Sequence, residues 1–220
     1  MSKKLFISTL LIFSFAFLIF NSAEAGKAST GWWIFRRPQS TKPKGLTTVA
    51  AVRGDLSGVL YNPSLLATVT QREIFFLSEL GLAEDTFGGV LYGQPISIGQ
   101  GAGISAGIIY YDAGKMTLYW VEGGQEKERT VSAQKDILGL ISYGQKISKT
   151  VLLGATVKGA NSNIAETKSA TAYALDLGLF FLPPIEGLSL SLAGQNIGLS
   201  TKFLEKAEDL PMCLWIGSSY

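Results

Sequence analysis

The sequence predicts an all-β protein, an antiparallel transmembrane β-barrel that follows an irregular or partly helical N-terminal segment. The main observation is a period of two. In residues 171–182 one face carries tyrosine, leucine and phenylalanine, and the other carries alanine, glycine and Asp176. Segments 151–158 and 188–193 repeat the pattern. Because a strand sends alternate side chains to opposite faces, each segment has one apolar face and one small or polar face, as membrane-spanning barrels require.

The N-terminus predicts export. Lys3 and Lys4 precede an uncharged stretch over 5–20, and the small-residue pattern Ala23-Glu24-Ala25 follows. These features predict a secretory signal peptide over 1–25, cleaved after Ala25. The alternative is an uncleaved anchor, for which the apolar run is short. An exported chain with this strand pattern belongs in the bacterial outer membrane, with outer-membrane lipid as its surroundings.

Composition excludes several classes of protein. The chain has 19 Lys and Arg against 17 Asp and Glu, so its near-neutral charge argues against nucleic acid as a partner. It has no histidine and a single cysteine, Cys213, so no zinc cluster and no internal disulfide is expected. No acid, base and nucleophile pattern appears, and we therefore expect neither an enzyme nor a cofactor.

Residues 26–71 form the N-terminal segment. Its first part mixes tryptophan, arginine and lysine without a sustained period, so it is expected to be irregular. Residues 55–66 predict one or two short helical turns around Asn62-Pro63. Proline is tolerated at a first helical position, where its missing N–H is not needed, so a second short helix can start there.

Residues 72–220 carry the predicted strands. The connections at 113–114, 146–150 and 183–186 are short, whereas those at 122–132, 160–170 and 198–211 are longer and polar. Short turns on one side and long loops on the other are typical of outer-membrane barrels, so the long connections are expected to be external loops. The candidate strands are 72–80, 86–93, 103–112, 115–121, 136–145, 151–159, 171–182, 187–197 and 212–220, with a further one around 46–52.

Two charged residues fall on the small-residue side of successive strands. If the hairpin turns near 164–166, Lys158 and Asp176 lie roughly opposite each other and can pair across the lumen as polar, lumen-facing side chains. A soluble barrel would instead place charges in mid-strand on its outer face. That soluble alternative, a periplasmic β-sheet binding protein, stays open.

Four segments carry a resemblance to a known family. The run GVLYNPSLLATV (58–69) resembles the Asn-Pro-Ala segment of FadL-like outer-membrane proteins, and three later segments resemble successive blocks of the PorV/PorQ group in that superfamily. The resemblance covers about residues 45–220. The later segments are ISYGQKISKTVLLGATVK (141–158), ALDLGLFFLPPIEGLSLSLAGQNIG (174–198) and LPMCLWIGSSY (210–220).

The resemblance implies a 14-stranded barrel with the N-terminal segment folded into the lumen as a hatch, and it makes Asn62 and Pro63 the hatch motif. Two departures matter. Arg53 and Asp55 stand where the family has small or acidic residues, and 210–220 resembles a strand from the middle of the barrel. The expectation is therefore a C-terminally truncated barrel of about 9–10 strands.

The resemblance also implies the function. FadL-like members carry small hydrophobic molecules, so transport of such solutes is the first hypothesis, with movement around Asn62-Pro63 opening the path. In the PorV/PorQ group it implies instead an accessory of a secretion or surface-anchoring machine, with secretion-machinery proteins as partners. A last expectation is that Tyr110, Tyr111, Tyr119 and Trp120 gather near strand ends, at a membrane interface.

Overall fold

A computed structural model describes residues 31–36, 53–81, 84–200, 202 and 208–220. The chain divides into two compact units, 1–30 and 31–220, and every described residue belongs to the second. The predicted signal peptide and the candidate strand at 46–52 lie outside the described residues.

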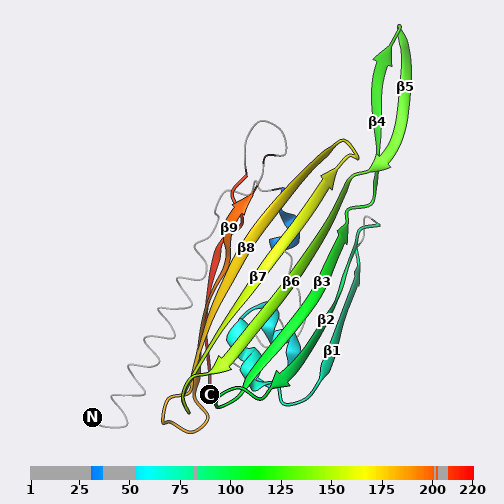
Figure 1. The fold of residues 1–220 in the computed structure, drawn as a ribbon. Coiled ribbons are helices and arrows are strands. Elements are labelled where there is room, and N and C mark those ends of the chain that lie inside the picture. Colours follow the sequence, from blue (N-terminus) through cyan, green and yellow to red (C-terminus); the bar gives the residue numbers. More distant parts are fainter. Residues whose placement is uncertain (1–30, 37–52, 82–83, 201, 203–207) are drawn as a thin grey trace. The chain divides into compact units, whose positions relative to one another are not determined.

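The described part of the chain forms ten strands and three short helices (Figure 1). Within it, no helix is long and apolar enough to cross a membrane. The helices are α2 (Trp33–Arg36), η2 (Leu56–Leu60) and η3 (Pro63–Thr68). The strands are β1 (Glu73–Leu80), β2 (Thr86–Ile96), β3 (Ala102–Asp112), β4 (Lys115–Glu122), β5 (Gln125–Ser132), β6 (Gln134–Lys146), β7 (Val151–Ile164), β8 (Lys168–Phe181), β9 (Ser189–Ser200) and β10 (Cys213–Ser219).

Eight strands form one antiparallel sheet in the order β1-β2-β3-β6-β7-β8-β9-β10. Neighbours in this sheet follow one another along the chain, except that the β4–β5 hairpin is inserted between β3 and β6 and forms a sheet of its own. The predicted all-β fold is confirmed. The sheet does not close within the described residues, because β1 pairs with β2 and β10 pairs with β9, and the order ends at these two strands.

The two faces of the large sheet differ, as the period of two predicts. In β6, buried and exposed residues alternate over most of the strand. Register carries this alternation across the sheet, so that Ile141 lies beside Ala106 and Val157 on the exposed side, which we call the outer face. Exposed outer-face residues from all eight strands include Phe76, Tyr92, Ile108, Ile141, Val157, Tyr173, Leu177, Leu192 and Ile216.

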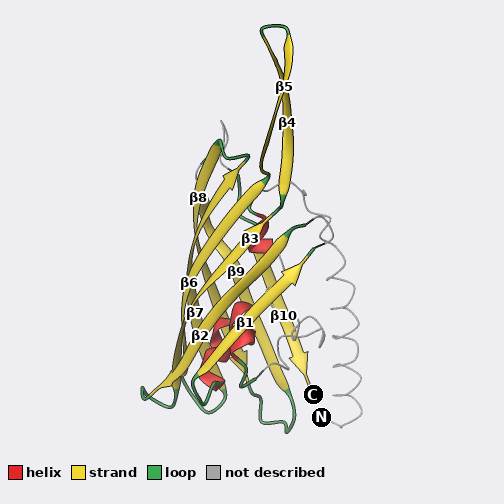
Figure 2. Cartoon of the chain, turned by 90° about the vertical axis from the view of Figure 1, so that its right-hand side faces the viewer, coloured by secondary structure: helices red, strands yellow, loops and turns green. Residues whose placement is uncertain are grey.

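The opposite, inner face of the sheet packs on α2, η2 and η3, which we call the inner layer (Figure 2). The contact between the inner layer and the large sheet, which we also call the wall, depends on four inward-facing glycines. They form a continuous register row on β3, β6, β7 and β8. The backbone of η3 lies directly on this row: a Cβ at the β6 glycine would come within 2.7 Å of the Pro63 carbonyl oxygen. Only glycine leaves room for that approach. The glycine row is Gly103, Gly144, Gly154 and Gly178.

Two predicted loops are strands instead. The prediction of a loop at 122–132 is wrong, because β5 pairs with β4 through a two-residue turn. Gly123 and Gly124 both have positive φ, 61° and 78°, which suits the turn that matches strand twist. The loop predicted at 160–170 is also mostly strand, since β7 runs to Ile164 and β8 starts at Lys168. The polar side chains of these segments led to the prediction of loops. The hydrogen bonds between strands are made by the backbone, so a strand can extend beyond the core with polar side chains on both faces.

The two glycines of β6 provide a matched test of the close packing. We expect Gly144→Ala to lower the free energy of unfolding by about 1–3 kcal/mol, because its new methyl group meets the backbone of η3. Gly139→Ala lies on the outer face with nothing within 4 Å of the added Cβ, so it should be neutral or raise stability by up to ~1 kcal/mol. Denaturant titration measures both, and equal effects would contradict the seating of η3 on the glycine row.

Candidate functional site

Asn62 and Pro63 begin η3 on the inner face. Asn62 is fully buried, and its Oδ1 accepts hydrogen bonds from the Ser64 backbone N–H at 3.0 Å and the Ser64 hydroxyl at 2.6 Å. This side chain therefore caps the helix. Pro63 occupies the first helical position, where its lack of an N–H costs nothing. The helix predicted to start here is confirmed.

The amide nitrogen of Asn62 has a second role. Its Nδ2 donates to the Ser191 hydroxyl on β9 at 2.9 Å and to the Leu179 carbonyl on β8 at 3.1 Å. A Cβ at Gly178 would overlap the Asn62 amide, so the side chain fits into the wall only where β8 has a glycine. Asn62 thus joins the start of η3 to two strands of the sheet.

Asp55 provides an internal comparison. It caps η2 in the same way, with Oδ1 accepting from the Ser57 N–H at 2.8 Å and the Ser57 hydroxyl at 2.6 Å. A cap needs only an acceptor, which a carboxylate supplies as well as an amide does. The donor of Asn62 is therefore what ties η3 to the wall.

Lys158 and Asp176 form a buried ion pair on the inner face. The Lys158 Nζ lies 2.6 Å from the Asp176 Oδ2, and the side chains are 3% and 1% exposed. In the register Asp176 faces Thr156, and Lys158 faces Ala174. The two residues are therefore diagonal neighbours rather than directly opposite, and the long lysine side chain covers the offset.

A β-bulge places two consecutive amides beside this pair. The β8–β9 register shifts between Leu175 and Leu177, so Asp176 faces both Gln195 and Asn196. Both amide residues are buried, although successive strand residues normally point to opposite faces. Asn196 has φ 58°, a conformation that asparagine tolerates better than most residues.

These four residues, which we call the bulge network, satisfy one another. The Asp176 Oδ1 accepts the Asn196 backbone N–H at 2.8 Å, and the Asn196 Oδ1 accepts from Lys158 at 3.1 Å. Unsatisfied buried polar groups are costly, so a complete network is what a sheet interior tolerates. The bulge network is Lys158, Asp176, Gln195 and Asn196.

A second polar cluster lies where β6 begins. The Gln134 amide donates to the Gly31 carbonyl at 2.9 Å and to both carboxylate oxygens of Asp136. Asp136 is 1% exposed and also accepts hydrogen bonds from Ser162 and from the backbone of Ile34. Through these hydrogen bonds to Gly31 and Ile34, the cluster attaches the N-terminal half of the 31–36 segment to the sheet.

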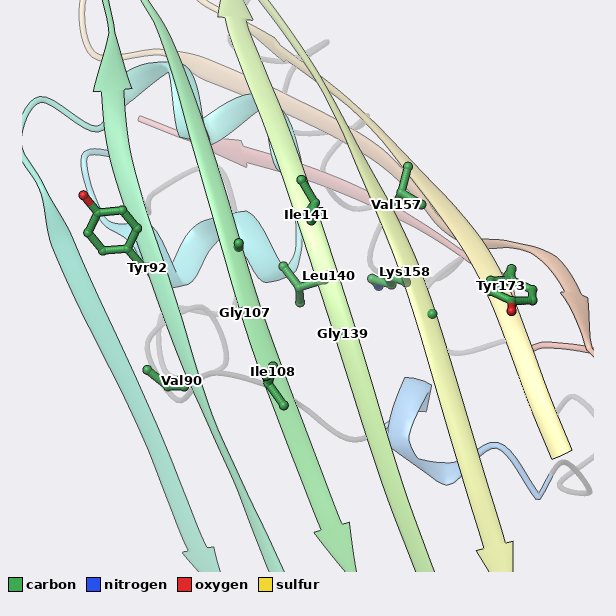
Figure 3. A pocket seen from close by; sticks show the side chains of 12 residues that line it. Val90, Tyr92, Gly107, Ile108, Gly139, Leu140, Ile141, Val157, Lys158 and Tyr173 are labelled. Atoms are coloured by element: carbon green, nitrogen blue, oxygen red, sulfur yellow. The ribbon is translucent and has the colours of Figure 1, made fainter. Parts of the chain in front are cut away.

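The outer face carries a shallow groove of about 620 Å³ (Figure 3). Its floor includes Gly139 and Gly159, which are register partners, and Tyr92, Ile141 and Tyr173 are among its other lining residues. The missing side chains of the two glycines create the hollow. In chemical terms the groove can accept apolar groups.

The four aromatic residues expected to gather at strand ends do not share one surface. Tyr110 is on the outer face, whereas Tyr111 packs against the buried core. Tyr119 and Trp120 lie on the β4–β5 hairpin, where Tyr119 is 74% exposed. In the described ranges, no three His, Cys, Asp or Glu side chains are grouped so that they could hold a metal ion.

Comparison with protein-family models and with curated proteins finds no match to this chain. The FadL-like resemblance therefore stays a prediction. From the sequence alone Asn196 could cap a strand end or a turn, with no chemistry of its own, and Gln195 carried no indication; the readiness of asparagine to adopt a positive φ is the signal that could have indicated an irregular strand. The sequence had not indicated the cluster around Asp136 at all.

The paired caps allow a sharp test. Asn62→Asp keeps the cap acceptor but loses the donor to Ser191 and Leu179 and buries a carboxylate without a cation, so we expect it to lower the free energy of unfolding by on the order of 3 kcal/mol. Asp55→Asn, which keeps the cap acceptor of η2, should change stability by less than ~1 kcal/mol. Urea unfolding measures both, and a neutral Asn62→Asp would refute the wall-binding role.

Proposed function

We propose that this chain is a bacterial outer-membrane protein whose sheet lies in lipid and whose inner layer controls the passage of small hydrophobic solutes. The outer face is the observation that carries the proposal. Across the eight strands of the sheet, its only charged positions are Asp112 and Lys135, which are register partners at one end. A soluble protein rarely exposes an apolar surface that extends over a whole sheet, so this face weighs against the soluble alternative.

The dimensions of the apolar band support a membrane. Along β6 the band lies between Lys135 and Gln145, a distance of about 34 Å at ~3.4 Å per residue. A tilt of roughly 40° would reduce this to about 26 Å, which matches the ~25 Å apolar band of outer-membrane barrels.

Tyrosines border the band at both ends. At the Gln145 end, Tyr143 donates to the Gln145 side chain at 2.9 Å. At the other end Tyr110 donates to Asp112 at 2.9 Å. Rings with an apolar body and a polar tip favour the membrane–water interface, so this arrangement fits two interfacial belts.

Lipid imposes a further condition on the sheet edges. Unpaired backbone groups in hydrocarbon cost several kcal/mol each, so β1 and β10 require partners in the membrane. The eight strands alternate in direction, which makes these two edges antiparallel to each other. Closure, directly or through further strands, is therefore compatible with the sheet.

The inner layer supports a gated passage. It covers the inner face through packing and side-chain hydrogen bonds. Its helices are not part of the backbone ladder that joins the strands of the sheet. Such an element can move without breaking the strand ladder. A solute path along the inner face would then open when these bonds are released.

The β4–β5 hairpin favours a second candidate function, an accessory that binds a partner protein. Val121 and Tyr119 are highly exposed on one face of it, beside Glu126 and Glu128 of β5. An isolated two-stranded hairpin is marginally stable in water, so a partner would stabilise it.

A charge at the middle of the band tests the lipid-facing surface. Ile141 is 69% exposed near the midpoint of the band, and Ile141→Lys should oppose membrane assembly by about 2–4 kcal/mol. Gln145→Lys, at the margin, should cost no more than ~1 kcal/mol. The fraction of protein that resists carbonate washing measures both. Full retention of Ile141→Lys would contradict the proposal.

Solute passage is tested in vesicles that carry lipopolysaccharide. A hydrophobic phenylnaphthylamine dye should enter vesicles containing the protein faster than vesicles of lipid alone, because the inner face would offer a path around the polar leaflet. A labelled sugar should enter both at the same rate. Equal dye uptake by the two preparations would exclude the transport function and leave the accessory function.

A further inference from the structure

The bulge network joins parts of the chain that are far apart in sequence. The Asn196 Nδ2 donates to the carbonyl oxygens of Phe35 at 3.3 Å and Pro211 at 3.1 Å. The neighbouring Gln195 donates to the Leu60 carbonyl at 2.8 Å and accepts from the Trp215 ring nitrogen at 2.8 Å. Two consecutive amides of β9 therefore hold α2, η2 and the β10 region together.

We propose that Asn196 retains the C-terminal half of the 31–36 segment on the inner face, and that the Lys158–Asp176 ion pair controls this retention by fixing the Asn196 amide. The proposal rests on the proposed function, in which release of the hydrogen bonds of the inner layer, including the one at Phe35, opens the passage.

The chemistry of the pair fixes the orientation of the amide. A lysine ammonium can only donate hydrogen bonds, so Lys158 selects the oxygen of the Asn196 amide, which lies 3.1 Å away. The NH₂ group must then point away from Lys158, toward the Phe35 and Pro211 carbonyls. Without the ammonium, the amide could rotate by half a turn and present its oxygen to those carbonyls, which would repel it.

Asp176 fixes the backbone of the same residue. Its Oδ1 accepts the Asn196 N–H at 2.8 Å, while its Oδ2 contacts Lys158. The carboxylate therefore stabilises the bulge as well as the cation. Since Asn196 has positive φ, a bond that holds this conformation also holds the side-chain direction.

The held segment is short and lies outside the sheet ladder. α2 has four residues, and the pair of bonds at Gly31 and Ile34 lies on its N-terminal side. Phe35 is buried, whereas Arg36 is exposed. The Asn196 contact is therefore the side-chain hydrogen bond on the C-terminal half of the described segment, and its loss should free that half first.

Hydrogen exchange in the full chain tests the proposal. Asn196→Gly tolerates the positive φ but lacks the amide, and Asn196→Asp keeps the acceptor for Lys158 but cannot donate to Phe35. Both should accelerate amide exchange in 32–36 by at least about tenfold, with exchange in β6 unchanged. Asn161→Ala, which removes an amide-to-carbonyl bond from the exposed side of β7, is the matched control and should leave 32–36 unchanged.

The single cysteine gives a second readout without an engineered labelling site. The Asn196 Nδ2 donates to the carbonyl of Pro211, two residues before Cys213, so loss of this hydrogen bond should also accelerate thiol modification in both Asn196 variants. Unchanged exchange and labelling in a folded Asn196→Gly would overturn the proposal. Loss of the sheet in both variants would overturn it too, because Asn196 would then be part of the fold and not the holder of a segment.

The ion pair is tested by Lys158→Met with Asp176→Leu, an apolar pair that leaves no unpaired buried charge. It should accelerate exchange in 32–36 as the Asn196 variants do. An effect confined to the Asn196 variants would refute control by the pair. The exchange measurements do not depend on transport. If the variants exchange faster in 32–36 but do not take up the dye faster in the vesicle assay, the proposed function is refuted and the retention by Asn196 stands.

Discussion

The close approach of the η3 backbone to the glycine row is the constraint on which the rest of the structure depends. Gly144 and Gly154 leave no space for a Cβ, because Pro63 lies directly against them. This contact fixes the height at which η3 crosses the sheet. It thereby places Asn62 against β8 and β9, where its amide finds the Ser191 hydroxyl and the Leu179 carbonyl.

The inner face combines this close packing with buried polar groups, a combination that is costly unless every group finds a partner. The bulge network meets the condition by an irregularity in the sheet. In a regular β9, either Gln195 or Asn196 would point outward. The Leu60 carbonyl would then lose its hydrogen bond from Gln195, or the Phe35 carbonyl its hydrogen bond from Asn196. The bulge is therefore the feature that connects the wall with the inner layer, and the ion pair stabilises the bulge.

The period of two made most of the large sheet predictable. Alternate side chains of its strands point to an apolar outer face and to a mixed inner face. The period of two failed for β5, whose polar sequence QEKERTVS has no buried side until its last residues. Short-range chemistry predicted the start of η3 at Asn62-Pro63, because capping and proline placement are local. The partners of the Asn62 amide are more than a hundred residues away in sequence, so no local pattern could indicate them.

The sequence by itself determined that the chain is an all-β protein, which strands have an apolar face, and that Lys158 and Asp176 share the opposite one. Alternation and residue type are local properties, and they decide these features directly. The tertiary structure alone decided the register that makes the pair diagonal, the bulge that turns Asn196 inward, and the glycine row. Each of these depends on which strands become neighbours, and hydrogen bonding across the sheet sets that choice only when the whole sheet has formed.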